Sequence, residues 1–80
     1  MPDGAAPPRD ERILDLRGLE PPEPLMRVFA ALDAAPDQPL RVRMLREPFP
    51  LYAMLRAGGW RYRTVTGSDG CFEILISRMT

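Results

Sequence analysis

Residues 12–24 decide the fold and read Arg-Ile-Leu-Asp-Leu-Arg-Gly-Leu-Glu-Pro-Pro-Glu-Pro. Leu14 and Leu16 alternate with Asp15, which is typical of a short strand with one buried face. The glycine predicts a turn, and the prolines after it cannot continue a strand because proline lacks the amide donor. Pro24 suits the first position of a helix. This segment therefore predicts a strand, a turn and the start of a helix.

The rest of the chain continues with alternating helical and strand patterns. Apolar side chains recur at helical spacing from Pro24 up to Pro36, and residues 51–57 predict a second short helix ended by two glycines. Residues 40–45, 60–66 and 71–77 alternate with period two, and the last two of these strands form a hairpin through an Asp-Gly turn. The order strand-helix-strand-helix-strand-strand predicts an α/β (α+β) two-layer sandwich. Its four-stranded mixed sheet carries both helices on one face, with the first two strands as parallel neighbours.

The phase of each pattern assigns side chains to the two faces of the sheet. Those expected under the helices are Leu14, Leu16, Leu40, Val42, Met44, Trp60, Tyr62, Phe72, Ile74 and Ile76, together with the helix residues Leu25, Val28, Phe29, Leu32, Leu51, Met54 and Leu55. Those expected on the open face are Arg41, Arg43, Arg61, Arg63 and Glu73. Arginine on an open sheet suggests nucleic acid, but RNA-binding sheets place aromatic residues on that face, whereas these aromatics should point inward. A solvated or protein-docking face is therefore favoured over a nucleic-acid partner.

Composition excludes several classes of mechanism. The 80 residues include 11 basic and 11 acidic ones, and every basic residue is arginine. Without histidine or lysine there is no Ser-His or Cys-His dyad, imidazole metal ligand or Schiff base. The single cysteine, Cys71, cannot form an internal disulfide and is too few for a zinc site, while Met26, Met44 and Met54 should fill the core. We expect no cofactor and no metal, and the balanced charge argues against nonspecific binding to nucleic acid or membranes.

The N-terminal residues differ in character from the rest of the chain. Residues 1–11 are rich in proline and small residues without periodicity, so we expect a flexible N-terminal tail before a single domain at 12–80. The chain has no apolar run near the roughly 20 residues that span a bilayer. It also begins without the basic and apolar regions of a signal peptide. We expect a cytoplasmic protein with no membrane partner.

Residues 14–24, Leu-Asp-Leu-Arg-Gly-Leu-Glu-Pro-Pro-Glu-Pro, resemble the signature of the TusA or SirA-like sulfur-carrier superfamily. In that superfamily a strand and a glycine precede a Cys-Pro-Glu-Pro turn at the first helix. The resemblance extends over roughly residues 12–78, and residues 46–52 with Gly59-Trp60 are similar to a branch of bacterial domains of unknown function that lacks the carrier cysteine. It implies the sulfur-carrier fold. Because Pro21 stands where the carriers hold their persulfide cysteine, it implies no sulfur transfer at that position.

Two sets of residues are candidates for binding. The residues predicted to bind a protein partner are Pro21, Pro22, Glu23, Pro24, Arg46, Glu47 and Phe49. Rigid prolines would lose little entropy on docking, although starting the two helices also accounts for them. Arg17 and Arg46 follow the first two strands and are candidates for binding a small anion, since ligands gather at the carboxyl ends of parallel strands. Ion pairs between arginine and glutamate would also account for these two residues.

The predicted function is that of a small non-enzymatic accessory domain that acts by contact with an unidentified protein partner. One alternative is a sulfur carrier that uses Cys71, and another is a module that binds small anions at Arg17 and Arg46. Cys71 begins the last strand, far along the chain from the first helix, where the carriers hold their sulfur. We therefore expect it to be a structural thiol.

Overall fold

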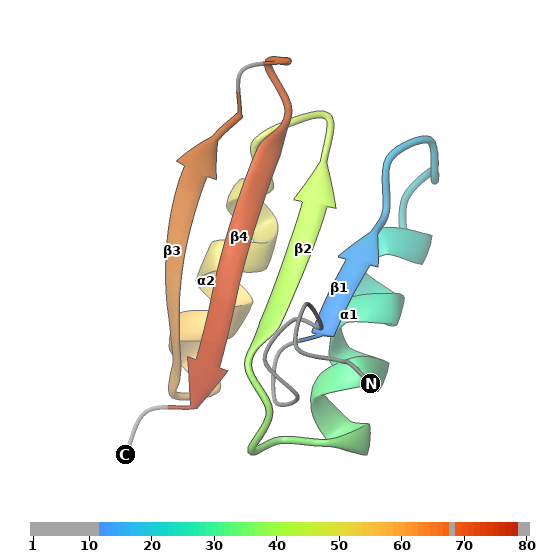
Figure 1. Ribbon diagram of the computed structural model, residues 1–80. Helices are drawn as coiled ribbons and strands as arrows, with labels where there is room; N and C mark the ends of the chain where they lie inside the picture. Colours follow the sequence, from blue (N-terminus) through green and yellow to red (C-terminus); the bar gives the residue numbers. More distant parts are fainter. Residues whose placement is uncertain (1–11, 68, 79–80) are drawn as a thin grey trace, which may run out of the picture.

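The computed structural model describes residues 12–67 and 69–78, so the tail predicted at 1–11 lies outside the described residues. Its elements are β1 (Arg12–Asp15), α1 (Glu23–Ala34), β2 (Leu40–Met44), α2 (Phe49–Ala57), β3 (Trp60–Thr66) and β4 (Phe72–Arg78). The sheet order is β1-β2-β4-β3, with β1 parallel to β2 and the other neighbours antiparallel. Both helices lie behind one face of this sheet (Figure 1). The predicted two-layer α+β fold is confirmed.

The core lies between the sheet and the two helices. Its buried apolar residues are Leu16, Val28, Leu32, Leu40, Val42, Met44, Leu51, Tyr52, Leu55, Ile74 and Ile76. The strands contribute alternate residues and α1 contributes one stripe, as the sequence pattern predicts. Each fully buried leucine or isoleucine stabilises the fold by about 1.5–3 kcal/mol relative to exposure. This layer fixes the positions of the loops that leave the ends of β1 and β2.

The inward face of α2 differs from the prediction. The helix buries Tyr52 beside Leu51 and Leu55, whereas Met54 is 46% exposed. Neighbouring residues on a helix differ by about 100° in direction, so a face centred on Leu55 turns Met54 outward. Met26 on α1 is also exposed, at 65%, and the prediction that both methionines fill the core was wrong.

Tyr52 holds α2 against the sheet through both its ring and its hydroxyl. The ring stacks on Tyr62 of β3 with centroids 4.7 Å apart, and the hydroxyl hydrogen-bonds with Thr64 and donates to Glu47 Oε2 at 3.2 Å. Burial raises the pKa of this hydroxyl, and the neighbouring Glu47 carboxylate also raises it. A buried tyrosine normally finds such partners, because an unpaired hydroxyl in the core is costly.

Arg12 of β1 caps the end of α1. Its guanidinium donates from Nη1 to the carbonyl of Ala31 at 2.9 Å and from Nη2 to that of Ala35 at 3.0 Å. The last turn of α1 contains no basic residue of its own, so an arginine from the neighbouring strand supplies the positive charge that the helix C-terminus favours. The sequence pattern alone identified Arg12 only as the start of a strand.

The parallel pair β1 and β2 brings two loops to one end of the sheet. Residues 16–22 follow β1, and residues 45–48 follow β2. In the first loop the backbone of Gly18 has φ 88°, a left-handed conformation that glycine adopts without steric cost. Among the described residues, neither helix is long and apolar enough to cross a membrane. The two loops and the helix starts after them form an apolar cavity.

Candidate functional site

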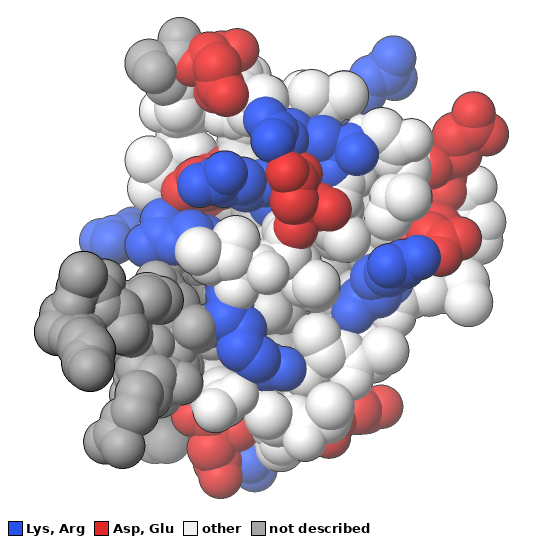
Figure 2. All heavy atoms as spheres, turned by 45° about the vertical axis from the view of Figure 1, so that its right-hand side comes forward, with Lys and Arg blue, Asp and Glu red and all other residues white. Residues whose placement is uncertain are grey.

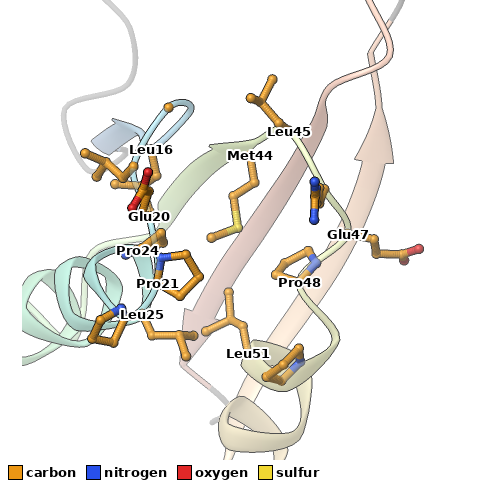
Figure 3. A pocket seen from close by; sticks show the side chains of 15 residues that line it. Leu16, Glu20, Pro21, Pro24, Leu25, Met44, Leu45, Glu47, Pro48 and Leu51 are labelled. Atoms are coloured by element: carbon orange, nitrogen blue, oxygen red, sulfur yellow. The ribbon is translucent and has the colours of Figure 1, made fainter.

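An apolar groove of about 490 Å³ lies between the two loops and the first turns of both helices (Figure 3). Its lining residues are Leu16, Gly18, Leu19, Glu20, Pro21, Pro22, Pro24, Leu25, Met44, Leu45, Arg46, Glu47, Pro48, Pro50 and Leu51. Figure 3 shows the side chains of Pro21, Met44 and Leu51 converging on the space between the two loops. The volume is within the range of about 300–1,000 Å³ that is usual for binding pockets.

Proline makes the walls of this groove rigid. Five of the lining residues are prolines, and four of them lie at the starts of the helices. Pro22 and Pro48 are the N-cap residues, and Pro24 and Pro50 lie in the first turns. Proline fixes φ and has no N–H, so these positions offer ring surface instead of backbone donors. Neither N-cap residue makes a side-chain capping hydrogen bond. The groove is therefore preformed and apolar, next to two helix ends of partial positive charge.

Three charged residues lie at the rim of the groove. Glu47 accepts the hydrogen bond from Tyr52 and points away from the cavity (Figure 3). Glu20 and Arg46 are exposed, and within the described part of the chain their side chains have no hydrogen-bond or ion-pair partner. One acid and one base at the rim are thus free to meet a ligand.

Most of the residues predicted to bind a partner meet in this groove. The five that line it are Pro21, Pro22, Pro24, Arg46 and Glu47. The other two do not line it. Glu23 forms an ion pair with Arg27 of the next helical turn at 3.0 Å, and Phe49 is exposed with its ring edge-on to Tyr52. The apolar floor, which includes Met44 and Leu51, was assigned to the core by its phase and was missed as part of a site.

The structure does not bring Arg17 and Arg46 together. Arg17 lines a second, polar hollow of about 250 Å³. Its Nη2 and Nε bind Asp15 on the open face of the sheet at 2.7 and 2.8 Å, and these hydrogen bonds lower the pKa of Asp15 to about 2. Arg17 and Arg46, the pair predicted to bind a small anion, thus line different cavities, because Asp15 holds Arg17 on the other side of the sheet.

Cys71 lies in the same polar hollow as Arg17 and outside the apolar groove. The thiol is half-buried, and its Sγ is 3.8 Å from Nη1 of Arg17. The Cys71 amide donates to Asp69 Oδ1 at 3.1 Å, which fixes the end of the hairpin. The thiol thus contacts the arginine of the β1–α1 loop, but it does not lie at the prolines where α1 begins. No local signal in the sequence links these two residues, which the sheet order alone brings together.

The open face of the sheet carries paired charges. Glu73 of β4 accepts from Arg41 and from Arg43 of β2, each at 2.8 Å, and these arginines lower the pKa of Glu73. Figure 2 shows acidic and basic side chains interleaved on the surface in view, without a broad region of one sign. These residues are half-buried at the surface, where an ion pair typically contributes about 0–1 kcal/mol. In residues 12–67 and 69–78 no group of histidine, cysteine, aspartate or glutamate could hold a metal ion.

Comparison with known proteins agrees with this architecture. The curated proteins contain no match. A SirA-like protein from Desulfitobacterium hafniense, whose structure has been solved, superposes with a TM-score of 0.74 and 20% sequence identity, covering 81% of this chain and 93% of that chain. The SirA-like fold that the sequence resembles is therefore confirmed. Residues 13–78 match the family described as uncharacterized conserved protein, DUF2249. This chain, with its SirA-like fold, belongs to the DUF2249 family.

Proposed function

We propose that this chain is a small, non-enzymatic cytoplasmic domain that binds a protein partner in the apolar groove. It belongs, on this proposal, to a branch of the fold that has lost the carrier cysteine. The observation that supports the proposal is the groove itself, which lies where α1 begins and has proline and aliphatic walls with no cysteine, serine or threonine among its lining residues. Such a surface suits recognition by contact.

The energetics of the groove favour docking. Apolar surface contributes about 25 cal/mol per Å² when it is removed from water. Leu45 at the rim is 58% exposed, so a partner that covers it would gain from its burial. Since the proline walls are already fixed, little conformational entropy would be lost on binding.

We expect Leu45→Asp to weaken partner binding at least about tenfold, because it places a charge where an apolar side chain would be buried. The exposed position of Leu45 keeps the cost to folding small. The measurement is quantitative mass spectrometry of proteins retained by the immobilised chain from a lysate of its own cells. Met54→Asp is the matched control, since Met54 is similarly exposed on α2 but does not line the groove. Equal retention by the two variants would remove the groove as the docking surface.

A second candidate function, sulfur transfer through Cys71, is favoured by the contact between its Sγ and the Arg17 guanidinium at 3.8 Å. In such a transfer the Cys71 sulfur would attack the outer sulfur of a donor persulfide and release the donor thiolate. If docking is the function, the intact mass of the chain stays unchanged after incubation with a cysteine desulfurase and cysteine. A gain of one sulfur atom that Cys71→Ser abolishes would instead establish the carrier.

A further inference from the structure

We propose that the occupant of the groove is a peptide segment of another protein in which one apolar residue is flanked by a basic residue on one side and an acidic residue on the other. This inference rests on the proposed docking function and specifies the chemistry of the partner. The apolar residue would enter the groove between Pro21, Met44 and Leu51.

The two unpaired charges of the rim lie on opposite walls. Glu20 belongs to the loop after β1, and Figure 3 shows it on the side of α1. Arg46 belongs to the loop after β2, which forms the facing wall before α2. A bound segment therefore passes between an acid and a base, and opposite charges on the segment complement both.

The other acids near the groove are already engaged. Glu23 is paired with Arg27, and Glu47 accepts from Tyr52. A simple inorganic anion fits the rim less well than a segment with both signs, because the Glu20 carboxylate would repel it. The mixed rim thus favours a ligand that carries one charge of each sign.

The proline walls favour recognition of side chains over pairing of backbones. Prolines 21, 22, 24, 48 and 50 offer no N–H to a bound strand, so a ladder of main-chain hydrogen bonds cannot form along them. The apolar residue of the bound segment then supplies most of the affinity, while the two rim charges select which residues flank it in the segment. Exposed rim charges of this kind change affinity by about fivefold each.

A random heptapeptide library panned against the chain and against two single charge reversals tests this inference. From the wild-type chain we expect peptides with an apolar residue between one basic and one acidic residue. Arg46→Glu should instead select two basic flanking residues, and Glu20→Arg two acidic ones. The matched controls are Asp37→Arg and Arg78→Glu, which reverse the charges of an ion pair of 3.1 Å outside the groove and should select the wild-type pattern.

The outcomes separate the inference from the proposed function. Enrichment of apolar peptides whose flanking charges ignore both reversals would overturn the inference and leave docking in place. If the Leu45→Asp variant selects the same peptides as the wild-type chain, both the inference and the proposed docking surface are overturned. Sedimentation could also show that the wild-type chain self-associates and that Leu45→Asp abolishes this association. That result would identify a second copy as the occupant of the groove and overturn the inference of a peptide segment from another protein.

Discussion

Replacing Leu51 with alanine is expected to lower the free energy of unfolding by about 2–5 kcal/mol. Leu51 lies in the first turn of α2, is fully buried in the core and also lines the groove. Its loss removes apolar contacts and leaves a cavity that the close-packed sheet and helices fill only in part. A domain of this size has about 5–15 kcal/mol of stability in total, so the change is large. Urea denaturation followed by circular dichroism measures it.

Met54→Ala provides the comparison on the same helix. Met54 is 46% exposed, and surface substitutions usually change stability by no more than about 0.5 kcal/mol. If Leu51→Ala and Met54→Ala lowered the free energy of unfolding by similar amounts, α2 would not present Leu51 to the core. The burial assigned to this helix would then be incorrect.

Arg12→Met is expected to cost about 1.5–3 kcal/mol, the range for hydrogen bonds to charged groups. Methionine keeps an apolar stem but cannot donate to the carbonyls of Ala31 and Ala35, so the end of α1 loses its cap. Among the described residues the buried Nε of Arg12 has no partner, and its removal offsets part of this cost. Hydrogen exchange should quicken most in the last turn of α1, and chemical denaturation gives the size of the loss.

Arg63→Met is the matched control for the cap. Arg63 is an exposed arginine on β3, and within the described part of the chain its side chain makes no hydrogen bond or ion pair. Its replacement should leave stability nearly unchanged. If both arginine variants lose the same free energy of unfolding, the effect comes from the loss of positive charge in general and not from a cap on α1.

Local patterns predicted the elements because each depends on neighbours in the sequence. The alternation around Asp15 and the stripe through Val28 and Leu32 are properties of single segments, and both are confirmed. The proline loops were expected at one edge of the sheet because the crossover rule makes β1 and β2 parallel. This rule is why five of the predicted partner residues meet in the groove.

What the sequence did not predict depends on contacts between distant segments. Arg12 reaches the end of α1 because the crossover between the parallel strands β1 and β2 brings that end back beside the start of β1. Arg17 reaches Cys71 across 54 positions of sequence because β4 pairs with β2 and not only with β3. The orientation of Tyr52 was missed for a different reason. A helix of nine residues has too few turns for its periodicity to decide which side faces inward, and stacking on Tyr62 decides it.

The sheet order also leaves β3, a strand of seven residues, at one edge. An uncovered strand of that length is a template on which further copies could add and grow into fibres. If two copies joined antiparallel about the middle of β3, Arg63 would meet Arg63, and like charges directly opposite are destabilising. Arg63 at the centre of β3 therefore disfavours this edge-to-edge pairing of two copies.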